Sequence, residues 1–427
     1  MKSPSGITII SVIPALVVVV VVVVVVILIS AIALPSSSPS SLRRDARERD
    51  MGRGGGVGRR RSMLLFDGMV RYETTTYKLP GDIERNFLDW YDYDDDDDDD
   101  EDVDVGGDGV GRRGRGGGRG GYNALPVFWH VLKSGGTSIK LMYAQCYHLV
   151  EACETGAQIV DVGDDEHGDN TEMMPPPPPP SELRVVISED GRKYVNVDVT
   201  TPHGILEASR LGFASSNLAD VIFTPLIAET ASSLVGWGGE NDDVGGNANG
   251  RRGRMFAIFR HPVHRVISIF YYLQSATWEP TYNPVYAGWT IDDYARSEYC
   301  ESDWMVRTLV NKMTGPLEPE DMNVAMEILK RKCLVGLMDD MEGSITRYHN
   351  YFRFETPYKN ALDCSRRNFA MKGGNVGQNG HIHPTLDPNS ETYTILEQKN
   401  MLDVRLYEYA RELYAEQGEW MMTKKLI

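Results

Sequence analysis

The distribution of apolar and polar residues divides the chain into three parts. From Ile7 to Leu34 the sequence is almost wholly apolar, with an unbroken valine run from Val17 to Val26 and no charged side chain. Because a helix of about 20 apolar residues spans a bilayer, the pattern predicts a transmembrane anchor over residues 7–34, preceded by a short tail over residues 1–6. A cleaved signal peptide is the alternative, since Ala31-Ile32-Ala33 has the small residues of a cleavage site.

Residues 35–121 show a different pattern, in which serine, proline, glycine and charged residues dominate. The segment includes an aspartate run, Asp94–Asp100, and a Gly/Arg tract, Gly111–Gly121. Such a composition cannot bury enough apolar surface to offset chain entropy, so we predict a disordered, low-complexity stalk. One stretch with scattered aromatic residues, Met63–Trp90, could dock on the folded domain.

Residues 122–427 alternate short apolar runs with helical patterns and are predicted to form the folded domain. The pair Asp190-Gly191 is typical of a hairpin turn between two strands. Strand–helix alternation predicts an α/β fold, a P-loop-like parallel sheet covered by helices on both faces. Two segments of loop composition, 163–181 and 236–253, are predicted inserts on its surface. The predicted strands are Leu125–Val131, Leu183–Ile187, Tyr194–Val199, Val221–Phe223, Met255–Phe259 and Cys333–Leu337.

Helices are predicted between and after these strands. Residues Ser138–Val150 follow a glycine turn, and a second helix begins at Pro262, where proline is favourable in the first turn. A third helix has Asp339 or Asp340 as its N-cap, and Glu391–Tyr414 forms a long terminal helix. In the helix at Pro262 the helical period gives one apolar stripe. Its members are Val263, Val266, Ile267, Phe270 and Leu273, while Arg265, Ser268 and Tyr272 fall on the opposite side.

Charge and cysteine content change this picture little. The net charge of the 427 residues is −17, but the aspartate run and the arginines around it dominate that value, so it says little about the folded domain. The five cysteines form no CxxC pair, which argues against a zinc site. They allow either one or two disulfides with a thiol left over, or buried free thiols.

Lys2 precedes the apolar span and several arginines follow it from Arg43, so the positive-inside rule by itself would place the domain in the cytosol.

The segment Val131–Ser138 (VLKSGGTS) carries the most specific chemical signal. It follows a predicted strand and opens a predicted helix, and its glycines let backbone N–H groups turn toward an anion. Lys133 supplies a mobile cation, and Thr137 and Ser138 supply hydroxyl donors. A nucleoside-triphosphate loop ends in Gly-Lys-Ser/Thr, whereas here the lysine precedes the glycines.

This order resembles the phosphosulfate loop of the sulfotransferases that use 3′-phosphoadenylyl sulfate (PAPS). The closest resemblance is to the Golgi carbohydrate sulfotransferases, of the heparan sulfate 2-O-sulfotransferase type, in which His-x-x-Lys-x-Gly-Gly-Thr-Ser is common. The run His130–Ser138 fits that pattern, with Leu132 in place of a common proline. The resemblance implies that Lys133, Ser134, Gly135, Gly136, Thr137 and Ser138 bind the donor.

A second segment, Phe259–Ser268 (FRHPVHRVIS), resembles the family's 3′-phosphate motif. There an arginine at a strand end and a serine on the following helix hold the 3′-phosphate, which implies this role for Arg260 and Ser268. Lys372-Gly373-Gly374 resembles the loop that closes over the donor, so Lys372 and Gly373 are further donor-binding candidates.

Sulfuryl transfer resembles phosphoryl transfer, with in-line attack and charge building on the leaving oxygen. Lys133 fits the role of stabilising that charge, and no metal is expected because the leaving group departs as a stabilised phosphate. The acceptor hydroxyl needs a base, which the family places between the two donor motifs. Glu229 and His203 are the candidates here, with Glu229 slightly ahead.

The predicted function is therefore PAPS-dependent sulfation of a glycan or related hydroxyl acceptor. The resemblance implies a single-pass type II protein of the Golgi membrane with a lumenal catalytic domain, and no nucleic-acid partner. Two alternatives belong to other classes: a nucleotide-binding kinase or ATPase, and a non-enzymatic RNA-binding protein that uses the Arg/Gly tract. The sequence leaves the acceptor and the oligomeric state open.

Overall fold

A seven-stranded sheet lies at the centre of the protein, in the order β3-β4-β2-β5-β1-β6-β7. The computed structural model describes residues 77–92, 124–160, 180–236, 250–277, 279, 281–354, 361–365 and 384–427. All adjacent strands are parallel except β3 and β4, which form an antiparallel pair. The strands are β1 (Ala124–Trp129), β2 (Val150–Ala152), β3 (Val185–Ile187), β4 (Lys193–Val195), β5 (Val221–Thr224), β6 (Arg252–Phe259) and β7 (Cys333–Leu337).

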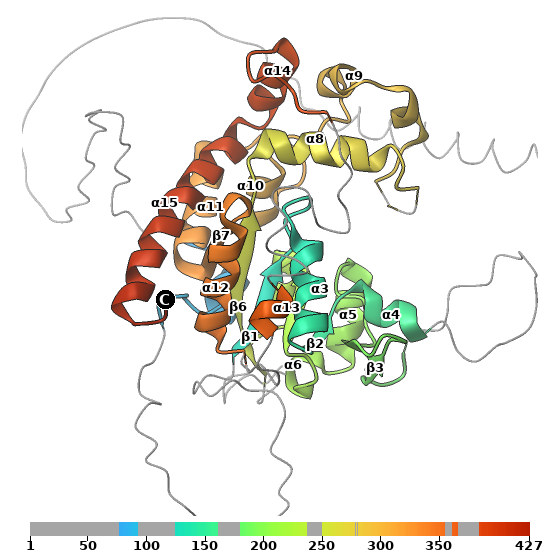
Figure 1. The fold of residues 1–427 in the computed structure, drawn as a ribbon, viewed down its shortest axis with the longest axis vertical. Coiled ribbons are helices and arrows are strands. Elements are labelled where there is room, and N and C mark those ends of the chain that lie inside the picture. Colours follow the sequence, from blue (N-terminus) through green and yellow to red (C-terminus); the bar gives the residue numbers. More distant parts are fainter. Residues whose placement is uncertain are drawn as a thin grey trace, which may run out of the picture. The chain divides into compact units, whose positions relative to one another are not determined.

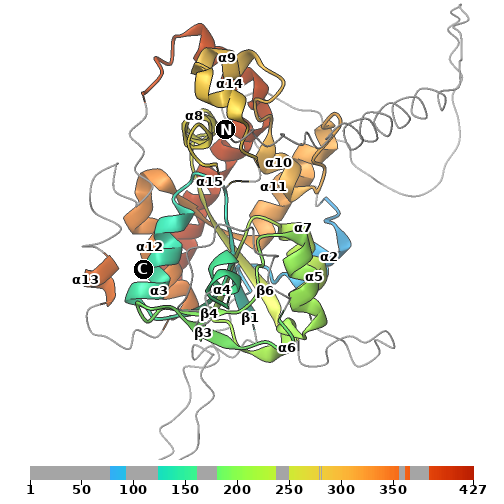
Figure 2. The same cartoon turned by 90° about the vertical axis from the view of Figure 1, so that its right-hand side faces the viewer.

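Helices cover both faces of this sheet, which confirms the predicted α/β class with a mostly parallel sheet. Figure 2 shows α3 and α12 on one side of the strands and α5 and α7 on the other. The helices of the first half are α2 (Gly81–Asn86), α3 (Gly136–Cys146), α4 (Glu154–Val160), α5 (Pro202–Arg210), α6 (Phe213–Ser216), α7 (Ile227–Ser233) and α8 (Pro262–Leu273). Those of the second half are η2 (Pro284–Gly288), α9 (Ile291–Arg296), α10 (Trp304–Leu309), α11 (Pro319–Lys332), η3 (Met338–Asp340), α12 (Met341–Phe352), α13 (Ala361–Ser365), α14 (Glu391–Lys399) and α15 (Met401–Thr423).

The central strands are buried on both faces, as their nearly continuous apolar sequences predict. On the α3 face, Phe128 of β1 lies in register with Phe223 of β5 and Phe256 of β6. These rings pack against Tyr143 of α3 and Tyr348 of α12. The other face packs against α5, α7, α10, α11 and α15. The central strand β1 is thereby fixed from both sides.

A third group of helices packs around α8, close to the carboxyl ends of β6 and β7. Figure 1 shows α8, α9 and α14 together beyond the end of the sheet. They share an apolar core of their own, which includes Val266, Phe270, Tyr294 and Leu396. Helix α8 begins at Pro262, and Asp340 caps α12 by accepting a hydrogen bond from Gly343 N, so both predicted helix starts are confirmed.

Several predicted boundaries are wrong. The helix predicted over Ser138–Val150 ends at Cys146, and its last predicted residue, Val150, is the first residue of β2 instead. The long terminal helix is divided at Asn400 into α14 and α15, because the Asn400 side chain hydrogen-bonds to Leu396 O and to Asp303 N. The insert predicted over 236–253 extends too far, since β6 already begins at Arg252.

Residues 77–92, within the predicted stalk, belong to the folded domain and correct its boundary. Ile83 of α2 and Phe87 are buried, and Phe87 forms a β-bridge with Gly253 of β6. The Trp90 ring meets that of Trp420 edge to face, with centroids 5.1 Å apart. The docking expected for the aromatic stretch is therefore confirmed over its described part.

The predicted transmembrane anchor, residues 7–34, and most of the stalk lie outside the described residues. So does most of the first predicted insert, 163–181. Among the helices that the structure does describe, none combines the length and the apolar character needed to cross a membrane.

Candidate functional site

The segment Val131–Ser138 lies at the point where the order of strands in the sheet reverses. Strand β1 has β5 on one side and β6 on the other. The chain leaves β1 through α3 toward β2, and it returns from β5 through α7 to β6. In open parallel sheets, ligands bind outside the carboxyl ends of the strands at such a switch point. The topology thus favours this loop as a ligand site.

The backbone of the loop takes conformations that suit a tight anion-binding turn. Lys133 has φ of 62° and Gly135 has φ of 87°, both in the left-handed region. Gly135 is the N-cap of α3 and has no side chain, so the first N–H groups of α3 receive no side-chain hydrogen bond at the cap. Ser134 is buried, and its hydroxyl has no hydrogen-bond partner among the described residues.

At both Gly135 and Gly136, close neighbours leave too little room for a Cβ atom. A Cβ on Gly135 would lie 2.6 Å from Cε of Met341, at the start of α12. A Cβ on Gly136 would lie 2.3 Å from Cδ2 of His130 and 3.0 Å from Cε1 of Phe128. The constraint at Gly136 is the tighter one, because Phe128, a residue of the sheet core, also lies close to the added Cβ and the imidazole therefore has little room to move. The paired glycines of the motif are therefore explained by packing as well as by turn geometry.

The structure brings the two predicted donor motifs into contact. Arg260, directly after β6, donates a hydrogen bond from Nη1 to the carbonyl oxygen of Lys133, at 3.1 Å. Burial lowers the pKa of the Arg260 guanidinium, while Asp339 opposes that effect. Ser268 lies two turns along α8 and is only 8% exposed.

Helix α8 is buried at Arg265 and Ser268 as well, on the side opposite its apolar stripe. Arg265, expected opposite the apolar stripe, is fully buried and forms ion pairs with Glu301 and Asp403. Its guanidinium lies 5.4 Å from the ring centre of Trp304. Asp403 also accepts hydrogen bonds from backbone N–H groups at the start of α10, at 2.9 and 3.0 Å. Arg265, opposite the apolar stripe of α8, is thus held by groups of other elements.

The Lys133 side chain points toward α8. Its Nζ lies 4.1 Å from the ring centre of Tyr272, whose hydroxyl donates a 2.5 Å hydrogen bond to Glu279. Burial and the nearby charge of Arg260 lower the pKa of Lys133, and Glu279 partly offsets them. The predicted cation of the loop is therefore held among charged and aromatic groups.

His130 lies beneath the loop as a neutral imidazole. Burial lowers the pKa of His130 to about 4, and the positive charges of Lys140 and Lys133 add to the effect, against that of Glu154. Its backbone N–H donates to Thr224 O at 2.8 Å, which continues the β1–β5 pairing by one residue. The histidine of the motif thus has a packing role against Gly136.

A partly buried ion pair lies next to the loop and was not expected from the sequence. Lys140 of α3 pairs with Glu154, the first residue of α4 after β2. Although burial opposes it, the Lys140 ammonium lowers the pKa of the Glu154 carboxyl. Glu154 is therefore a carboxylate that follows a parallel strand, at the edge of the sheet where the loop lies. A short strand after the turn at His148 would have been the signal for it.

The two predicted base candidates have different environments. Glu229 lies half-buried in the first turn of α7, which follows β5. His203 is exposed in the first turn of α5, where its electrostatic neighbour is Glu207. The structure describes no contact between either side chain and the loop.

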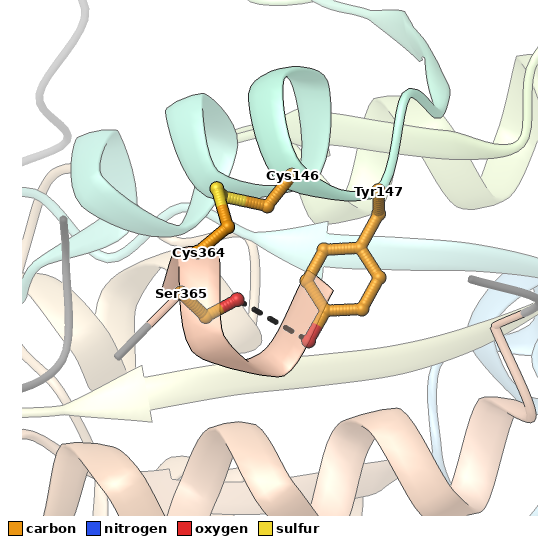
Figure 3. The surroundings of a disulfide bond; sticks show 4 residues. All are labelled: Cys146, Tyr147, Cys364 and Ser365. Atoms are coloured by element: carbon orange, nitrogen blue, oxygen red, sulfur yellow. Dashed lines mark hydrogen bonds between the residues drawn. A yellow bond between two sulfur atoms is a disulfide. The ribbon is translucent and has the colours of Figure 1, made fainter. Parts of the chain in front are cut away.

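A disulfide joins the end of α3 to α13. Cys146 and Cys364 are bonded, with their Cα atoms 5.7 Å apart, and the Ser365 hydroxyl donates to the Tyr147 hydroxyl at 3.3 Å (Figure 3). The other three cysteines are buried free thiols, so the chain combines both arrangements that the sequence left open. Lys372 and Gly373, which were predicted to belong to a loop that closes over the donor, lie outside the described residues.

Within the part of the chain that the structure describes, no group of three or more His, Cys, Asp or Glu side chains could hold a metal ion. In comparisons with known proteins, the sequence matches no family model and no curated protein.

Proposed function

We propose that this protein is a sulfotransferase that moves a sulfuryl group from PAPS to a hydroxyl of a glycan or related acceptor. The observation that carries the proposal is the hydrogen bond from Arg260 to the Lys133 carbonyl. It joins the glycine loop to the second motif, so that the two predicted donor-binding segments lie side by side. A donor with a phosphosulfate at one end and a 3′-phosphate nearby requires such a pair.

In this proposal, the residues of the two motifs bind different parts of the donor. The N–H groups at the start of α3 would hold the 5′-phosphate, since a helix N-terminus attracts anions. Arg260 and Ser268 would hold the 3′-phosphate. The Lys133 ammonium would stabilise the negative charge that builds on the bridging oxygen as the sulfur–oxygen bond breaks. The products are the sulfated acceptor and adenosine 3′,5′-bisphosphate.

The acceptor hydroxyl must lose its proton as its oxygen bonds to sulfur. Glu154 joins Glu229 and His203 as a candidate base, because Lys140 keeps its carboxyl ionised next to the loop. Glu154→Gln, Glu229→Gln and His203→Ala separate the three. Only the variant that removes the base should lose turnover while it still binds adenosine 3′,5′-bisphosphate. Full activity in all three would exclude every one of these residues.

The same proposal places the protein in the Golgi membrane, as a type II protein with its catalytic domain in the lumen. The Cys146–Cys364 disulfide supports an oxidising compartment, whereas the arginines after the apolar span favour the opposite orientation. Protease treatment of sealed Golgi vesicles tests this point. The domain should resist digestion until detergent opens the vesicles, and digestion in intact vesicles would refute lumenal placement.

The test of the activity uses the full-length chain, because a fragment that starts at residue 122 would lack α2. Calorimetry should show binding of adenosine 3′,5′-bisphosphate, and PAPS with an acceptor should give a sulfated product. Lys133→Ala should lower kcat by a factor of about 10²–10³. The control Lys330→Ala removes an exposed lysine on α11 and should leave kcat unchanged. Absence of bisphosphate binding, or equal activity of the two variants, would refute the proposal.

A further inference from the structure

The Lys133 side chain has a defined partner on α8. Its Nζ lies 4.1 Å from the ring centre of Tyr272, at the end of α8, within the range of a cation–π interaction. The Tyr272 hydroxyl donates a 2.5 Å hydrogen bond to Oε1 of Glu279. A phenol that donates to a carboxylate has a more electron-rich ring, so the two contacts reinforce each other. Lysine, tyrosine and glutamate therefore form a chain that starts at the loop.

We propose that Tyr272 and Glu279 are positioning residues that hold the Lys133 ammonium charged and in place beside the glycine loop, ready for the donor. This inference rests on the proposed sulfotransferase function and adds two residues to its site. Neither residue belongs to the motifs that define the loop and the 3′-phosphate site. Both lie beyond Ser268, where α8 ends and the chain turns.

The charges around Lys133 make such a holder necessary. Arg260 lies at the end of β6 and His130 at the end of β1, and Tyr272 and Glu279 complete the surroundings. Burial and Arg260 lower the pKa of Lys133, whereas Glu279 raises it. Glu279 is thus the acidic group that counteracts the loss of the lysine charge. A neutral amine could not stabilise a leaving phosphate.

The positioning role is separable from a structural one. Tyr272 and Glu279 are both half-buried rather than part of the core. The chain beyond α8 has its own attachments, since the Gln274 side chain donates to Tyr286 O and Trp289 O at 3.0 and 3.1 Å. Replacing Glu279 by glutamine or Tyr272 by phenylalanine keeps the size of each side chain. We therefore expect both variants to fold.

The test measures the titration of Lys133 directly. Reductive methylation with ¹³C-formaldehyde labels the lysines of the full-length protein, and the Lys133 resonance is assigned by its absence in Lys133→Arg. In Glu279→Gln the midpoint of this resonance should fall by about one pH unit, and in Tyr272→Phe it should fall less. Glu279→Asp should restore most of the wild-type value. Glu298→Gln removes an exposed carboxylate and should leave the midpoint unchanged.

An unchanged Lys133 midpoint in Glu279→Gln would overturn the inference, as would an equal change in the Glu298→Gln control. The kinetic prediction is that the alkaline limb of kcat moves to lower pH in Glu279→Gln by the same amount, with little change in KM. An alkaline limb that stays in place would also overturn it. Calorimetry with adenosine 3′,5′-bisphosphate is a separate measurement. Its failure in the wild-type protein would refute the sulfotransferase proposal, whereas the NMR midpoint reports on Tyr272 and Glu279 alone.

Discussion

His130 should make the stability of the protein depend on pH in a defined window. Burial next to Lys140 and Lys133 lowers its pKa to about 4, from an ordinary value of 6.5. Between these values the unfolded chain binds a proton that the folded chain does not, so stability should fall as the pH falls from about 6.5 to about 4. The contribution of His130 is fully present above pH 6.5.

The size of this effect follows from the two pKa values. Their difference of about 2.5 units corresponds to roughly 3 kcal/mol at 1.36 kcal/mol per unit. His130→Gln removes the titration and keeps a polar side chain of similar reach. Its free energy of unfolding should vary less with pH than that of the wild type, and the two curves should diverge over the window.

Urea unfolding followed by tryptophan fluorescence, repeated at several pH values from 4 to 7.5, measures both curves. The comparison removes the contributions of all other groups, which are common to the two proteins. His203→Gln is the matched control, because it makes the same substitution at an exposed histidine on α5. If the wild-type and His130→Gln curves are parallel between pH 6.5 and 4, the pKa of His130 is not lowered in the folded protein and the argument fails.

Three further outcomes are expected. Gly136→Ala places a Cβ 2.3 Å from the His130 imidazole, so it should lower the free energy of unfolding by about 1–3 kcal/mol and impair binding of adenosine 3′,5′-bisphosphate. Gly288→Ala, where the added Cβ meets open space, is the control and should leave urea unfolding nearly unchanged. Arg260→Ala or Ser268→Ala should weaken binding of adenosine 3′,5′-bisphosphate much more than that of adenosine 5′-phosphate; equal losses by calorimetry would count against 3′-phosphate recognition. Cys146→Ser should lower the free energy of unfolding by about 2–4 kcal/mol, and reductant should then have no further effect, which a denaturation series with and without reductant checks.

Much of the fold could be predicted because the central strands are nearly continuous apolar runs. Strand β2 was missed since its middle residue, Glu151, is a fully buried carboxyl group, and burial raises its pKa well above the ordinary value. No local pattern announces a buried glutamate. The break at Asn400 was missed for a similar reason, because its side chain bonds to Asp303, which is distant in sequence.

In the candidate site, too, some residues could be predicted from the sequence and others could not. The loop and Arg260 could be predicted, because glycine spacing and an arginine at a strand end are local features. The burial of Arg265 could not, because it depends on Glu301 and Asp403 from other elements. The ion pair that makes Glu154 a candidate base likewise joins two helices. A single sequence does not show which residues will form ion pairs between elements that are distant in the chain.

The disulfide at the end of α3 has a consequence for the order of events during synthesis. Cys146 and its partner Cys364 are 218 residues apart, and Cys153, Cys300 and Cys333 all leave the ribosome between them. Cys146 therefore meets three other thiols before its partner exists. In the finished domain those three are buried, and a buried thiol is shielded from exchange. Correct pairing thus requires that Cys146 either stays reduced or exchanges any earlier partner by thiol–disulfide exchange until Cys364 has been translated.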